Sequence, residues 1–308
     1  MSTPVAQPRA RRPRPYHARP LTPSGNLRRR QRISRLTEGG MIASAVIAVG
    51  LLALVVYTVV VRGASAISFA FLTQSPQVVG NGGGQAPVIV GSIALVHIAT
   101  ALSMPIAILT ALYLTEFASS RVANVVRVSL DVLNGVPSIV IGVFVFGLLV
   151  AGSHHQSGFA GALGLAIIML PLIARATQEM LRLVPLGLRE AAEALGVSRW
   201  RTVFGVLLPS VVGGVLTGTV LAVARAAGET APLLFCTGVA PSGVSLANLN
   251  PFAHGVANIP TEIFTLSDSD NPASFTQAWG LALVLLTFIL LANIAARTLL
   301  ARSRRVQR

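Results

Sequence analysis

Residues 41–61 constrain the fold more than any other part of the chain, because they form an apolar run without a single charge. About 20 such residues suffice to cross the hydrocarbon core of a bilayer, and a helix satisfies its own backbone hydrogen bonds there. Only 11% of the chain is charged, whereas soluble domains carry about 25%. The sequence therefore predicts an all-α membrane bundle of six transmembrane helices, at 41–61, 88–114, 132–151, 161–180, 203–227 and 278–300.

The placement of basic residues orients this bundle. All 24 of them are arginines, and they gather in alternate connections, at 1–39, 116–127, 182–201 and 297–308. The other connections contain only Arg62, at the edge of the first span. Because cytoplasmic loops carry the excess of basic residues, we expect both termini and the 182–202 loop in the cytoplasm, and the 238–277 loop outside. The expected organisation is a tail at 1–39, a six-helix membrane domain at 40–302 and a short cytoplasmic end at 303–308.

The first 39 residues hold ten arginines and one acid, Glu38, among many prolines. Such a composition cannot bury a core, so we expect this tail to be disordered. A nucleic-acid-binding arm or a lipid-binding tail would be equally basic. We favour a tail that fixes membrane topology, and we expect no nucleic-acid partner.

Several short patterns resemble cofactor sites without completing one. The glycine-rich segment 80–84 lacks the Gly-Lys-Ser/Thr ending and the preceding strand of a phosphate-binding loop. The pair His154 and His155 is a weak metal signal, and segment 268–270 lacks the glycine and glutamate of a calcium loop. We therefore predict no cofactor or metal in this chain, and any energy from ATP would have to come from a partner.

Two isolated residues inside the apolar segments have more ordinary interpretations. His97, in the second predicted span, is compatible with a proton relay, but a lone histidine is more often a helix-packing donor. Cys236 is the only cysteine, which excludes an internal disulfide, and we expect it to be a small buried apolar residue.

The most informative loop contains the sequence REAAEALGVSRWR, at 189–201. Pro185 ends the preceding helix, alanine and glutamate favour a short helix after it, and Gly196 marks the end of that helix. The small side chains in this stretch allow another surface to approach closely. Trp200, between two arginines, is typical of a membrane interface. Composition alone is equally compatible with an ordinary amphipathic loop.

The spacing within this loop resembles the EAA loop of ABC importer permeases. Glu-Ala-Ala is followed at the family's spacing by glycine and then by Leu-Pro, with Val206 where the family usually has isoleucine. In that family the loop forms a coupling helix that docks into a groove on the ATPase subunit. The resemblance assigns this role to Glu190, Ala191, Ala192, Gly196, Leu208 and Pro209.

Three further segments resemble the A-type permeases of phosphate-specific ABC importers, and they read LNGVPSIVIG at 133–142, LPLIARAT at 170–177 and ARAAGETAPLLF at 224–235. This likeness implies the type I ABC importer permease fold and phosphate as the substrate. It also implies several partners, namely a C-type permease in a heterodimer, two ATPase subunits, an external phosphate-binding protein and a link to a signalling kinase. In the family, the arginines that match Arg175 and Arg225 are needed for transport.

Charged residues inside the predicted spans point to a pathway. A charge at the bilayer centre costs about 2.5–3.5 kcal/mol, so such residues face a cavity or a partner. Arg225 and Glu229 are four residues apart and share one helical face, and Arg175 and Glu179 repeat this spacing. Because the guanidinium fork matches phosphate oxygens, we predict Arg225 as the main anion contact, Glu229 as its counter-ion and Arg175 as a second contact. Pairs that merely tie helices together are the alternative, and Glu179, near the cytoplasmic end, is alternatively a solvated residue.

Other functions stay open at this point. A permease for another oxyanion, such as sulfate or molybdate, would use the same arginine chemistry, although the 133–142 and 224–235 segments favour phosphate. A membrane sensor or scaffold without flux is a second possibility. An intramembrane enzyme would need a nucleophile–base pair or a metal cluster within the spans, and the sequence indicates neither.

Overall fold

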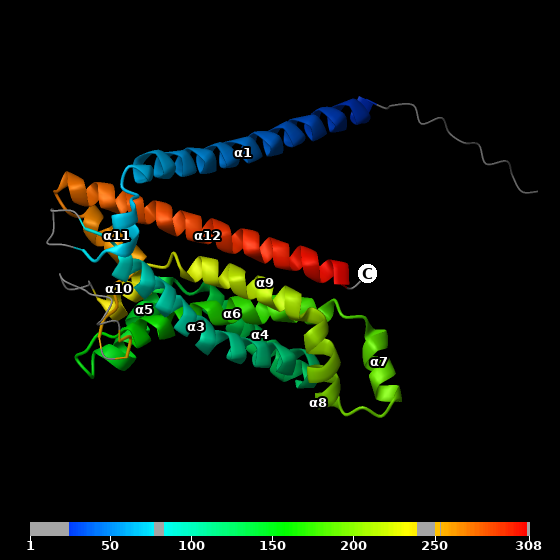
Figure 1. Ribbon diagram of the computed structural model, residues 1–308. Coiled ribbons are helices and arrows are strands. Elements are labelled where there is room, and N and C mark those ends of the chain that lie inside the picture. The colour runs from blue at the N-terminus through cyan, green and yellow to red at the C-terminus, as the bar shows by residue number, and fades with distance from the viewer. Residues whose placement is uncertain (1–24, 77–82, 239–249, 253, 307–308) are drawn as a thin grey trace, which may run out of the picture. The chain divides into compact units, whose positions relative to one another are not determined.

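The computed structural model describes residues 25–76, 83–238, 250–252 and 254–306 (Figure 1). Their regular structure is helical, which confirms the predicted all-α class. The chain divides into two compact units, Met1–Val56 and Tyr57–Arg308.

Helix α1 (Gly25–Ala64) begins inside the tail that we expected to be disordered. The last proline of this tail is Pro23, and the leucine, arginine and glutamine residues that follow it favour a helix. Residues 25–39 therefore extend the first predicted span as a continuous helix, which corrects the expectation for that part of the tail. Residues 1–24 and 307–308 lie outside the described residues.

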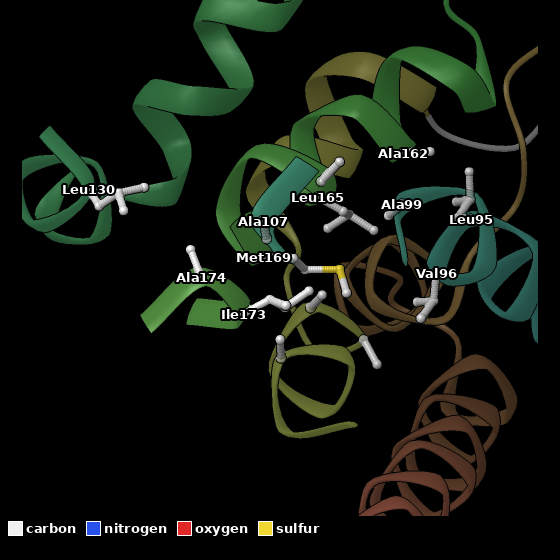
Figure 2. Packing of buried hydrophobic residues seen from close by; sticks show 14 of the residues in the cluster. Leu95, Val96, Ala99, Ala107, Leu130, Ala162, Leu165, Met169, Ile173 and Ala174 are labelled. Atoms are coloured by element: carbon white, nitrogen blue, oxygen red, sulfur yellow. The ribbon is translucent and has the colours of Figure 1, made fainter. Parts of the chain in front are cut away.

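Four long helices build the second unit, namely α3 (Ala86–Leu112), α6 (Gly158–Arg182), α9 (Leu208–Ala226) and α12 (Pro272–Val306). Helix α6 packs against α3 and α9, and α9 packs against α12. Small residues allow this approach, because a Cβ on Gly218 of α9 would collide with the Ala176 methyl group of α6. Figure 2 shows Leu165, Met169 and Ile173 in the core that forms along α6.

Five helical stretches among the described residues are long and apolar enough to cross a bilayer, namely Arg29–Ala64, Ala86–Phe117, Gly158–Arg182, Arg199–Ala226 and Pro272–Thr298. They correspond to five of the six predicted spans. The predicted third span, 132–151, is instead divided between α4 (Ser120–Gly135) and a helix made of α5 (Ser138–Val145) and η2 (Phe146–Val150), with a bend of 98°. Pro137 causes this break, because a proline disfavours helical backbone at the preceding residue. The count of six holds if the bent pair is one span.

The predicted outer loop, 238–277, is more structured than expected in its described part. It contains α11 (Ile259–Ser267), and α10 (Ala231–Thr237) precedes it. Between these helices Ala257 and Asn258 are fully buried, and a Cβ on Gly91 of α3 would collide with the Ala257 carbonyl oxygen. Asn258 caps α11 and donates to Thr237 Oγ1 of α10 (3.1 Å). This segment therefore closes the end of the bundle opposite the 182–202 loop.

The 182–202 loop forms the predicted short helix, α7 (Leu186–Ala194), followed by α8 (Arg199–Thr202). Gly196 ends it with a φ of 69°, a backbone conformation that favours glycine. The Gly196 N–H donates to the Glu193 carbonyl (2.9 Å) and the Val197 N–H to the Ala192 carbonyl (3.0 Å). These two bonds satisfy the last carbonyls of α7 in the pattern of a Schellman motif.

Three further features noted in the sequence are the lone cysteine, the histidine of the second span and the glycine-rich segment. Cys236 is buried, as predicted. A ring nitrogen of His97 lies 2.7 Å from the Ile93 carbonyl of its own helix, rather than bonding across helices. Most of the glycine-rich segment, residues 80–82, lies outside the described residues.

Candidate translocation pathway and coupling loop

Arg225 and Glu229 lie where α9 ends. The helix stops at Ala226, so Glu229 does not continue the helical face of Arg225, as its spacing predicted. The chain turns instead, and the Glu229 N–H donates to the Ala226 carbonyl (3.1 Å). This turn brings Glu229 Oε1 to 3.7 Å from Arg225 Nε. The predicted ion pair is therefore present, but a turn forms it rather than a helix.

The two partners of this pair differ in exposure. The Arg225 side chain is 54% exposed, whereas that of Glu229 is 16% exposed. A separation of 3.7 Å is longer than a hydrogen bond. Glu229 thus sits close enough to balance the charge of Arg225 while leaving its N–H donors open to a ligand.

The alignment of α9 with α12 indicates how deep Arg225 lies along the apolar span of α12. These helices run in opposite directions (Figure 1), and Thr217 Oγ1 donates to the Ala296 carbonyl (3.3 Å). Because each helix rises about 1.5 Å per residue, Arg225 is level with about residue 288 of α12. The apolar span of α12 is Pro272–Thr298. Arg225 therefore lies near the middle of this span rather than at either surface.

Arg175 of α6 has a different partner from the predicted one. Its Nη2 contacts Asp131 Oδ1 of α4 and donates to the Arg127 carbonyl (3.3 Å). Glu179 pairs instead with Arg182 (3.3 Å), and both of these side chains are exposed. The prediction of an Arg175–Glu179 pair is wrong because α4 packs beside α6 and supplies another carboxylate. Glu179 lies one turn closer to the 182–202 loop, which we call the coupling loop after its resemblance to the EAA loop, and there it reaches solvent.

The contacts between α6 and α9 relate the two arginines. Gly214 faces Met180 and Gly218 faces Ala176, so the helices are antiparallel. This register puts Arg175 about six residues, or about 9 Å along the axis, closer to the coupling loop than Arg225. The structure therefore does not gather them into one cluster, and they are two separate positions along the bundle.

The residues predicted for ATPase coupling fall into two groups. Glu190 and Ala191 are exposed on α7, Ala192 is buried, and Gly196 forms the turn described above. Leu208 and Pro209 instead begin α9, after the π-helix η3 (Val203–Leu207). Leu208 packs against a cluster at the base of the bundle, formed by Leu112, Leu181, Val184, Val203, Leu207, Val211 and Val215.

Sequence reasoning missed two acids that the structure makes prominent. Glu116 accepts from Arg189 Nη2 at 2.8 Å, and Asp131 pairs with Arg175 as described. The signal was available in the sequence, because the chain has only ten acids, and Glu116 and Asp131 each lie within two residues of a predicted span. An acid close to a span requires a partner, although the sequence does not say which arginine provides it.

Comparisons with known proteins identify the family of this chain. Residues 103–305 match the family described as the binding-protein-dependent transport system inner membrane component. The phosphate transport system permease protein PstA of Yersinia pestis is 39% identical over 81% of this chain and 84% of its own length. PstA of Haemophilus influenzae is 37% identical over 86% of this chain and 92% of its own length. The chain belongs to the PstA permease family.

Solved structures agree with this PstA-family permease in fold. An inward-facing MetNI methionine ABC transporter gives a TM-score of 0.57, over 70% of this chain and 94% of that one. The identity is 16%, so this likeness concerns the fold alone. The PstA-family permease is thus a multi-pass inner-membrane transport component and not an enzyme. Its family works with ATPase and substrate-binding partners.

Proposed function

We propose that this chain is a permease subunit of an ATP-driven importer of inorganic phosphate. The observation that carries this proposal is Arg225, a half-exposed guanidinium near mid-membrane depth whose counter-ion is close but not hydrogen-bonded. A bare charge at this depth is costly, so it belongs in a wetted pathway rather than in lipid. The PstA names of the relatives support phosphate as the anion.

The ion pairs suit transport because passage requires release as well as binding. An arginine fork donates to phosphate oxygens, and Glu229 restores the balance of charge when the site is empty. Arg175 forms a second position, about 9 Å nearer the coupling loop. There the anion replaces Asp131 as the partner of the guanidinium. At Arg175 this exchange replaces one charge-assisted interaction with another, and at Arg225 the nearby carboxylate of Glu229 repels the bound anion, so neither position becomes a trap.

Partner subunits supply the energy for this transport. We place this chain in a heterodimer with a C-type permease, with two ATPase subunits that bind ATP and Mg²⁺ and contact α7. A phosphate-binding protein delivers the anion to the opposite face, and closure of the ATPase dimer changes which face is open. A link to a signalling kinase would be an additional role of the same complex.

The direct test is labelled phosphate uptake at low external phosphate by cells that lack this gene, with and without the wild-type chain. We expect the chain to restore uptake that excess sulfate does not inhibit. Inhibition by sulfate would instead indicate a permease for several oxyanions. Failure to restore uptake, with the chain present in the membrane, would favour a sensor or scaffold.

Asp131→Asn is expected to lower both the apparent KM for phosphate and the maximal rate. The substitution removes the competing carboxylate, so Arg175 binds the anion more tightly and releases it more slowly. We expect a change of about tenfold in KM, because interactions with charged groups contribute about 1.5–3 kcal/mol. Uptake kinetics measure both constants, with Asp268→Asn, an exposed acid, as the control. Unchanged constants would remove Asp131 from the pathway.

The orientation of the chain is also a proposal, with both termini and α7 in the cytoplasm. Cys236 is the only cysteine, so Cys236→Ala provides a background for labelling single introduced cysteines. An impermeant maleimide is expected to label Ser153→Cys in intact spheroplasts, and Ser198→Cys only after they are disrupted. The reverse pattern of labelling would invert the assigned topology.

A further inference from the structure

A π-helical turn at the end of α3, η1 (Tyr113–Phe117), holds the coupling loop at two points. Glu116 Oε1 lies 2.8 Å from Arg189 Nη2 of α7. The next residue, Phe117, stacks on Trp200 of α8 with 4.5 Å between ring centroids. Gly196 lies between α7 and α8, so one turn of α3 contacts the loop on both sides of its bend.

The Glu116–Arg189 pair is shielded from water, since the two side chains are 8% and 23% exposed. The same Arg189 nitrogen donates to the Leu181 carbonyl at the end of α6 (3.1 Å). A single guanidinium therefore joins α3, α6 and α7. Charges attract more strongly away from water, and removing one partner of a buried pair leaves an uncompensated charge.

The rest of α7 packs little against the bundle. Its leucines, Leu186 and Leu188, are exposed, as is Leu195 just beyond its end, and its buried residue is Ala192. Within the described part of the chain, Arg189 is the side chain of α7 that bonds to a membrane helix. Among the side-chain contacts described for α7 itself, this ion pair is the one that reaches α3, since α7 has no broad apolar contact, while the Phe117–Trp200 stack joins η1 to α8.

We propose that the Glu116–Arg189 ion pair transmits the movement of the coupling helix α7 to α3 and α6. Both are positioning residues, because they act through helices and not on the substrate. The π-turn suits this role, since such turns frequently occur at functional sites. The inference rests on the proposed function, in which α7 contacts an ATPase subunit.

The test uses the complete transporter in lipid vesicles, with its partner permease, ATPase subunits and binding protein. ATP hydrolysis is measured with and without the phosphate-loaded binding protein, together with phosphate import. The variants are Glu116→Gln, Arg189→Gln and the apolar double variant Glu116→Leu/Arg189→Met. Arg121→Gln, an exposed arginine of α4, is the control. Folded yield and thermal midpoint are recorded for each variant.

The single variants are expected to lose stability, because each leaves a buried group without its charged partner. The double variant is expected to fold like the wild type, since replacing both partners of a buried pair with apolar groups is often neutral. Its stimulation of ATP hydrolysis by the loaded binding protein, and its import per ATP, are nevertheless expected to fall by about tenfold, within the usual range of coupling between sites. If the pair were merely structural, the well-folded double variant would keep wild-type stimulation of ATP hydrolysis and wild-type import per ATP.

Wild-type stimulation and import per ATP in a well-folded double variant would overturn the proposal. The proposed function is judged from another signal in the same vesicles. Wild-type vesicles whose ATP hydrolysis responds to the binding protein, but which import no phosphate, would overturn the proposed function. In that case the stimulation of ATP hydrolysis by the binding protein, compared between the variants and the wild type, still tests the role of the ion pair.

Discussion

Arg225→Gln is expected to reduce phosphate uptake to the level of cells that lack the chain. Glutamine keeps hydrogen-bonding groups but not the charge, and it leaves Glu229 without its partner near mid-membrane. A fall of at least about 100-fold is expected, because a lost charged hydrogen bond and an unpaired, partly buried carboxylate each cost about 1.5–3 kcal/mol. Labelled phosphate uptake in complemented cells measures this loss, with chain levels in the membrane determined in parallel.

Two further variants separate a pathway role from a structural one. Arg121→Gln removes an exposed arginine elsewhere and is expected to leave uptake unchanged. Arg225→Gln/Glu229→Gln removes both charges, so it is expected to restore membrane levels without restoring uptake. Normal uptake in Arg225→Gln would exclude Arg225 as an anion contact. Recovery of uptake in the double variant would mean that the Arg225–Glu229 pair has a structural role and does not contact the anion.

Gly91→Ala is expected to destabilise the chain, although alanine is normally the better helix former. The new methyl group would collide with the Ala257 carbonyl oxygen, a backbone atom that cannot rotate away. Overpacking of this kind costs about 1–3 kcal/mol. The thermal midpoint of the purified protein in detergent should fall, and the folded yield should fall with it.

Gly147→Ala is the matched control for this prediction. A Cβ at Gly147 would meet no atom within 4 Å, so the same substitution should be neutral or slightly stabilising. Equal stability of the two variants would show that the segment around Ala257 is not packed against α3 in the membrane.

The sequence was sufficient for features that depend on neighbouring residues. The length of each apolar run located five spans, and the short helix before Gly196 followed from its composition. Pro137 is visible in the sequence, but the 98° bend that it permits depends on the packing of α4 and α5. A prediction based on hydrophobicity alone treats the residues on both sides of such a break as one straight span.

Pairs between distant residues were beyond sequence reasoning. Spacing assigned Glu179 to Arg175 because both lie on α6, but the actual partner, Asp131, comes from another helix. Glu116 and Arg189 are 73 residues apart, and no local pattern links them. The buried Ala257 lies in what reads as a polar outer loop. In each case the deciding factor is which helices pack together.

Helix α3 carries contacts at both of its ends. Near its start, Gly91 packs against Ala257 and Ser92 Oγ accepts from the Ile259 N–H (2.7 Å). About 37 Å away, at about 1.5 Å per residue, Glu116 binds the coupling helix.

These two contacts share one helical stretch, Ala86–Phe117, which contains Pro105, a residue that cannot donate a backbone hydrogen bond, and ends in the π-turn η1. The proposed role of the Glu116–Arg189 pair makes binding at the two ends of this helix thermodynamically linked. If a partner at one end changes the affinity at the other end, its own affinity changes by the same factor when that other end is occupied. In the proposed function, the binding protein and the ATPase would each sense the other's occupancy through this helix.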